Sequence, residues 1–183
     1  MRHFLIYSGL SHLQMKKLLH YILFFILISC TILSCTDRSI HEKELFGEMD
    51  SLLESNPDSA YAQLKKIQSK IDSINDTGLS IRQLMYKTSA QNKLYLKMPS
   101  DTIFQSVVDY YAKYGTANDR MKSLYLMGCI YRDMHEAPQA LKYYQEATES
   151  ADTLSSDCDY HLLICIYGQI ILLPNLRPVT LCC

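Results

Sequence analysis

The sequence predicts an all-α fold made of antiparallel helix pairs, preceded by a hydrophobic helix near the N-terminus. Three observations support this prediction. Apolar residues such as Leu124, Met127 and Tyr131 recur at the spacing of one helix face. Turn residues and prolines separate the helical stretches, and no stretch alternates apolar and polar residues as a strand does. The 183 residues are enough for one domain.

The first 35 residues have the pattern of a secretory signal peptide. Met15-Lys16-Lys17 gives a positive start, residues 18–28 form an apolar run, and small residues follow it. Met15 is also a natural start, so residues 1–14 are expected to lie upstream of the true beginning. The alternative is an uncleaved membrane helix. However, residues 18–33 form a run of 16, and a spanning helix needs about 20.

The end of this segment resembles a bacterial lipobox, Ile32-Leu33-Ser34-Cys35. In that family the cysteine is diacylated and becomes the new N-terminus. Leu27-Ile28-Ser29-Cys30 is a second match, which leaves Cys30 as the alternative site. We prefer Cys35 because polar residues begin immediately after it. The resemblance implies a lipid-anchored protein of the cell envelope, facing the periplasm or the cell surface.

A polar tether over residues 36–42 is expected to lead into a helical domain over residues 43–173. The first helix is predicted over residues 41–53, and Ser55-Asn56-Pro57 ends it. Pro57 suits the first turn of a second helix, because an N–H there would have no partner within the helix. This second helix carries an Ala60-x3-Leu64-x2-Ile67 spacing.

Two more helices are predicted before residue 117. Turn residues at 75–78 precede a helix over residues 79–96, which Met98-Pro99 ends. Ser100 or Asp101 can cap the next helix, which Tyr114-Gly115 ends. The apolar side of this helix is predicted to consist of Ile103, Phe104, Val107, Val108 and Tyr111.

The clearest helix pair covers residues 121–154. Gly128 and Ala140 carry almost no side chain, so the two backbones can approach closely there. Gly inside a helix costs about 1 kcal/mol relative to Ala, and close packing would offset this cost. Pro138 begins the second helix after a break at residues 135–138. The residues predicted to pack the pair are Leu124, Met127, Gly128, Tyr131, Ala140, Tyr144 and Ala147.

This pair resembles a tetratricopeptide repeat, a helix–turn–helix unit of about 34 residues. Leu124 stands where that family favours Trp, Met127 where it favours Leu, and Tyr144 where it favours Phe. The closing Pro of the family is absent. The resemblance implies a solenoid of helix pairs that binds an unidentified protein or peptide. A generic helical hairpin is the alternative.

With the lipobox, the chain resembles the tetratricopeptide-repeat lipoproteins of Bacteroides-type bacteria. This resemblance implies a membrane-tethered scaffold for protein–protein interaction. One alternative is the sensor fragment of a signalling or transcription regulator that lacks its output domain. Another is a glycan-binding outer-membrane lipoprotein. That class needs a much longer chain, and the lack of Trp disfavours it further.

A ligand groove would be expected on the side formed by the first helices of successive pairs. Lys122, Tyr125 and Arg132 lie beside the packing stripe of the first helix of the clear pair. The two cations could hold a carboxylate, and the tyrosine could supply contact area. The alternative is a solvated helix face without a ligand.

A last helix is predicted from about residue 156 to residue 172, followed by an irregular tail over residues 174–183. Pro174 and Pro178 interrupt the helical pattern after it. The helix therefore lacks a partner, and we expect a chain that is truncated relative to longer relatives; a small irregular cap is the alternative. The apolar face left uncovered would consist of Ile164, Ile166, Ile170, Ile171, Leu172 and Leu173.

Composition and motifs argue against catalysis and against nucleic-acid binding. The sequence has no Gly-x-Ser-x-Gly elbow, no phosphate-binding glycine loop and no His-Glu-x2-His motif. We therefore expect no enzyme activity, no cofactor and no metal. Three of the 18 basic residues precede Cys35, so the remainder holds 15 basic and 19 acidic residues. This mildly acidic balance argues against DNA or RNA as a partner.

Overall fold

A computed structural model describes residues 16–26, 42–154 and 158–172. The chain divides into two compact units, Met1–Gly47 and Glu48–Cys183. The regular secondary structure of the described residues is helical, and no strand occurs among them. The prediction of an all-α chain with packed helix pairs is therefore confirmed at this level.

The first unit contains a helix over residues 16–26 with apolar, solvent-exposed side chains. Leu18, Tyr21, Ile22, Phe25 and Ile26 lie along one face of it, at the i, i+3, i+4 spacing of an α-helix. Within the described parts of the chain, no helix is both long and apolar enough to cross a bilayer. The predicted lipobox and both candidate cysteines, Cys30 and Cys35, lie outside the described residues.

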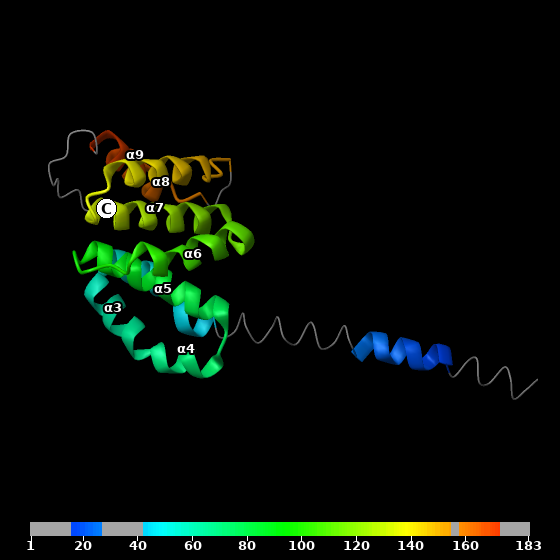
Figure 1. Cartoon of the computed structure of the whole chain (residues 1–183). Helices are drawn as coiled ribbons and strands as arrows, with labels where there is room; N and C mark the ends of the chain where they lie inside the picture. Colours follow the sequence, from blue (N-terminus) through cyan, green and yellow to red (C-terminus); the bar gives the residue numbers. More distant parts are fainter. Residues whose placement is uncertain (1–15, 27–41, 155–157, 173–183) are drawn as a thin grey trace, which may run out of the picture. The chain divides into compact units, whose positions relative to one another are not determined.

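The second unit consists of eight α-helices among its described residues (Figure 1). Their bounds are α2 (Met49–Ser55), α3 (Pro57–Lys66), α4 (Gln68–Ile74), α5 (Thr77–Lys93), α6 (Asp101–Tyr114), α7 (Ala117–Asp133), α8 (Ala137–Glu149) and α9 (Tyr160–Leu172). The helix expected over residues 79–96 starts and ends slightly earlier than predicted, and α4 is a separate short helix that was not predicted.

Side-chain caps explain where four of these helices, α3, α5, α6 and α7, begin. Asn56, Asp76 and Ser100 each accept a hydrogen bond from a backbone N–H in the first turn of α3, α5 and α6. These bonds satisfy donors that have no partner within the helix. At α7, Thr116 and Asp119 cap each other reciprocally in a capping box. The predicted cap at Ser100 is confirmed, whereas the capping box was not predicted.

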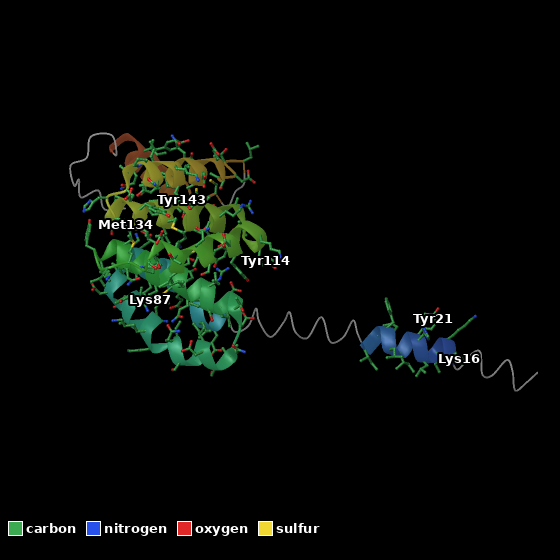
Figure 2. The ribbon with its side chains drawn as sticks, viewed as in Figure 1. Lys16, Tyr21, Lys87, Tyr114, Met134 and Tyr143 are labelled. Carbon is green, nitrogen blue, oxygen red and sulfur yellow. The ribbon has the colours of Figure 1, made fainter. Side chains whose placement is uncertain are left out.

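The helices from α5 to α8 form one stack in chain order (Figure 1). Tyr114, which ends α6, and Met134, which follows α7, lie on opposite sides of the stack in Figure 2. α6 and α7 are therefore antiparallel. Each helix of the stack contacts the next, and the contact between α7 and α8 is the most extensive. One apolar core runs through α5 to α9 and contains Phe104, Leu126 and Ile166, all nearly inaccessible to water.

Equivalent positions in this array recur at a constant interval along the sequence. α5 runs from Thr77 to Lys93, and α7 runs from Ala117 to Asp133. Each end of α7 therefore lies 40 positions after the corresponding end of α5. The same interval separates Asn92 on α5 from Arg132 on α7. Leu64, Phe104 and Tyr144 follow one another at this interval on α3, α6 and α8, and each is 0% exposed. These three helices therefore each place one large side chain in the core at an equivalent position.

Two details of the predicted apolar faces are wrong. Ile103 was assigned to the buried side of α6, but it is 57% exposed, because the buried face of that helix consists of Phe104, Val107, Val108 and Tyr111. Ile166 was assigned to an uncovered face of α9, but it is fully buried. Ile164, which was assigned to the same face, is 71% exposed as expected, and the side chains of Ile171, Leu172 and Leu173 lie outside the described residues.

Candidate functional site

The contact between α7 and α8 places the residues predicted to pack the helix pair. Met127, Gly128, Ala140, Tyr144 and Ala147 are buried. The other two predicted packing residues, Leu124 and Tyr131, are half-buried at the edge of the same contact. The Tyr131 ring stacks on Tyr143 of α8, with ring centroids 5.4 Å apart.

Tyr144 is the central side chain of this contact. Its ring lies against Gly128, where no side chain intervenes, and 5.9 Å from the Tyr125 ring. Its hydroxyl donates to Cys129 Sγ over 3.6 Å. Burial raises the pKa of Tyr144 and also that of Cys129, so both groups stay protonated at neutral pH. Cys129 is therefore a packing residue with an inert thiol.

A second group of residues forms a polar strip across α2, α5 and α7, which we call the α2–α5–α7 strip. It contains Asp50, Glu54, Tyr86, Asn92, Lys93, Lys122, Arg132 and Asp133. The helices carrying these residues contact one another, α2 with α5 and α5 with α7. Most of its interactions join different helices, and the Arg132–Asp133 pair on α7 is the exception, so the strip differs from an ordinary solvated helix face.

Asp50, Tyr86 and Lys122 form the first half of the strip. The Tyr86 hydroxyl donates to Asp50 Oδ2 over 2.8 Å, and Lys122 Nζ donates to Asp50 Oδ1 over 3.0 Å. Lys122 Nζ also lies 4.9 Å from the centre of the Tyr86 ring. The Asp50 side chain remains 70% exposed, while that of Lys122 is 22% exposed. The carboxylate is thus presented outward on a partly covered cation.

Arg132 and Asn92 join α7 to α5 in the second half of the strip. Arg132 Nη2 donates to Asn92 Oδ1 over 3.0 Å, and the guanidinium also pairs with Asp133 at 2.8 Å. Lys93 Nζ lies 3.0 Å from Glu54 Oε1, which connects α5 to α2. Each of these cations is half-buried and each acid is more exposed. The strip therefore has two acid–base pairs that connect helices and one at the end of α7.

The pKa values of Asp50 and Tyr86 in the strip are both shifted away from neutral pH. Burial would raise the pKa of Asp50, but the ammonium of Lys122 and the hydrogen bond from Tyr86 outweigh it, so that this pKa is lowered. Burial and the adjacent Asp50 raise the pKa of Tyr86. At neutral pH the carboxylate stays ionised and the phenol stays protonated. A general acid or base needs a pKa near the working pH, and neither group provides one.

The three residues predicted for a ligand groove have different surroundings. Lys122 and Arg132 lie on the strip, where each already has a carboxylate partner. Tyr125 is only 7% exposed and packs against Tyr144, so its ring contributes to the core and offers little surface to a ligand. Its hydroxyl lies 3.5 Å from Asn92 Nδ2, at the edge of the strip. That Lys122 and Arg132 hold a ligand carboxylate stays a prediction.

Sequence reasoning missed Asp50, Tyr86 and Asn92 as members of the strip. Asp50 and Lys122 are separated by 72 residues, and Asn92 and Arg132 by 40. The second separation equals the interval between equivalent positions of α5 and α7, so an internal comparison at that spacing would have aligned Asn92 with Arg132. The first has no such signal in the sequence. Among the described residues, no group of three or more His, Cys, Asp or Glu could hold a metal ion.

The sequence and the structure were also compared with known proteins. No family model, no curated protein and no solved structure matches the chain.

Proposed function

We propose that this chain is a membrane-tethered scaffold that binds another protein or a peptide on the α2–α5–α7 strip. The observation that carries the proposal is the set of outward-facing acids held on half-buried cations across three helices. Such pairs contribute little to folding when they are exposed, typically about 0–1 kcal/mol. Their arrangement is better suited to fixing the register and orientation of a charged partner.

The stacking of the helices also supports this proposal. Antiparallel helices stacked in chain order bury one face against their neighbours and leave a continuous outer surface, as in solenoid proteins. We propose a tetratricopeptide-like solenoid, with one difference from that family. Equivalent positions here lie 40 residues apart, as Asn92 and Arg132 do, whereas the tetratricopeptide unit has about 34 residues.

Site-specific photocrosslinking in the native host tests the proposed binding surface. A photoreactive phenylalanine analogue at Glu54 would stand on the strip, where that side chain is 70% exposed. The matched control places the same analogue at Lys142 on α8, whose side chain is 67% exposed. We expect a discrete crosslinked protein from position 54 and none from position 142. We also expect the adduct to disappear in a Lys122→Glu, Arg132→Glu background, because two of the three cations of the strip are then reversed.

Equal crosslinking at both positions, or an adduct that survives the charge reversal, would show that the strip is not the binding surface. Circular dichroism of the charge-reversed chain provides the folding control. The helical signal should persist, since both cations are partly exposed and their removal leaves the apolar core intact.

The membrane tether is proposed at Cys35, which lies outside the described residues. Two acyl chains hold a protein stably in a membrane, whereas one does so only marginally. We therefore expect the wild-type chain to incorporate a palmitate analogue and to remain in the membrane fraction. Cys35→Ala with Cys30 intact should abolish the labelling. Undiminished labelling of Cys35→Ala, followed by its loss in Cys30→Ala, would move the anchor to Cys30.

A further inference from the structure

Two donors from two helices converge on the carboxylate of Asp50 in the α2–α5–α7 strip. The Tyr86 hydroxyl of α5 donates to Oδ2 over 2.8 Å, and Lys122 Nζ of α7 donates to Oδ1 over 3.0 Å. Each carboxylate oxygen therefore has a donor of its own. Donors that reach both oxygens of one carboxylate recognise it by orientation as well as by charge. The arrangement is that of a binding site for a carboxylate.

The two donors are much more buried than the carboxylate that they hold. Tyr86 is 4% exposed and the Lys122 side chain is 22% exposed, whereas the Asp50 side chain is 70% exposed. Lys122 Nζ also lies 4.9 Å from the centre of the Tyr86 ring, so the two donors support each other. The donors are thus fixed in the helix array, while the carboxylate lies on its outer side. Another carboxylate can therefore replace it without disturbing the apolar core.

A second cation acts on the same point from the equivalent position of the neighbouring helix. Arg82 on α5 precedes Lys122 on α7 by 40 residues, the interval between equivalent positions in the array. Burial opposes the ionisation of Asp50, but the charges of Lys122 and Arg82 and the hydrogen bond from Tyr86 outweigh it, so the pKa of this carboxyl is lowered. A carboxylate at this point is therefore stabilised by positive charges from two successive helices.

We propose that Tyr86 and Lys122 form a carboxylate-binding site of the strip, in which Asp50 is an internal ligand that an acidic side chain of the partner protein replaces. The inference rests on the proposed function and adds to it the chemistry of the partner, an acidic segment. Glu54, one turn after Asp50 on α2, holds Lys93 in the same way, with the acid again the more exposed member of the pair. A segment with two carboxylates about one helical turn apart would replace both internal acids.

An internal ligand weakens the binding of an external one. The apparent affinity for the partner is reduced to the fraction of the time that the site is free. Exposed ion pairs are weak, so Asp50 leaves the site free for an appreciable fraction of the time and does not close it. Removal of Asp50 should therefore tighten the binding of an acidic ligand, whereas removal of either donor should weaken it.

A fluorescently labelled hexaglutamate peptide is a suitable probe, and hexaglutamine is its uncharged control. Fluorescence anisotropy at low ionic strength would measure the binding of each peptide to the full chain in lipid nanodiscs. We expect Asp50→Ala to bind hexaglutamate about two- to sixfold more tightly than the parent chain does. The matched control is Glu146→Ala on α8, which removes an acid that pairs with Lys142 at 3.7 Å. It changes the net charge by the same amount and should not produce this gain.

Two further variants, made in the Asp50→Ala chain, test the donors. Tyr86→Phe removes the hydroxyl and keeps the buried ring, and Lys122→Met removes the charge and keeps most of the apolar stem. Each should cancel most of the gain in hexaglutamate binding. Circular dichroism should show the same helical signal for all these chains, because none of the changes removes a side chain from the apolar core α5–α9.

Three results would overturn the inference. They are a gain in Asp50→Ala no larger than that in Glu146→Ala, a gain that survives both donor variants, and binding of hexaglutamine as tight as that of hexaglutamate.

Crosslinking from position 54 separates these failures from a failure of the proposed function. A charge-dependent adduct without a gain in Asp50→Ala would leave the strip as the binding surface but would exclude Asp50 as an internal ligand. A gain without any adduct would leave the carboxylate site and would exclude a protein partner on the strip.

Discussion

Gly128→Leu is expected to destabilise the chain strongly, although glycine is a poor helix residue. A Cβ at position 128 would lie 2.5 Å from Cδ1 of Tyr144, far inside van der Waals contact. The ring cannot withdraw easily, because it is fully buried and its hydroxyl bonds to Cys129. Overpacking of this kind costs about 1–3 kcal/mol, against a gain of about 1 kcal/mol from replacing glycine in a helix. We expect the steric cost to dominate and the free energy of unfolding to fall.

Gly168→Leu is the matched control for this prediction. Both glycines lie in the interior of a helix, and their positions are equivalent in α7 and α9. No atom of the described residues lies within 4 Å of a Cβ at position 168, so only the gain in helix propensity remains. Chemical denaturation followed by circular dichroism should show opposite signs for the two substitutions. If Gly128→Leu were as stable as the parent chain, the close approach of Tyr144 to α7 would not be required for stability.

The contrast between these glycines shows which parts of the structure could be predicted from the sequence and which could not. Helical spacing, prolines and small residues were sufficient to predict the helix pair and the contact around Gly128. They also predicted the apolar character of the last helix. They did not predict which side of that helix is covered, because Ile164 and Ile166 are equally apolar and only the register with α7 separates them. Ile103 and its neighbour Phe104 are likewise both apolar, so the sequence alone did not show which of the two is buried in α6.

The α2–α5–α7 strip could not be predicted from the sequence for a different reason. Asp50, Tyr86 and Lys122 belong to three helices, and none of the three residues has an unusual local context. Their interaction exists only because α5 contacts both α2 and α7. Lys122 and Arg132 could be placed beside the packing stripe of one helix by periodicity. Asp50 and Asn92, which accept their hydrogen bonds from other helices, are brought there only by the tertiary arrangement.

Tyr144→Ala is expected to have the largest effect of any single substitution considered. Its side chain is fully buried, packs against Gly128 and the Tyr125 ring, and donates a hydrogen bond to Cys129. Replacing a large buried aromatic by alanine typically costs about 3–5 kcal/mol, because apolar burial is lost and a cavity remains. This cost is a large fraction of the roughly 5–15 kcal/mol that stabilises a typical domain. Urea denaturation should therefore give a much lower midpoint than for the parent chain.

Tyr143→Ala is the control, since this neighbouring tyrosine on α8 is only half-buried and stacks on Tyr131 at the edge of the contact. We expect a clearly smaller loss there, because less area is buried and solvent can fill the space. Combining Tyr144→Ala with Gly128→Leu provides a further test. The leucine can occupy part of the space that the ring vacates, so the double variant should be more stable than the sum of the two single effects predicts. Strict additivity would mean that residues 128 and 144 do not pack against each other.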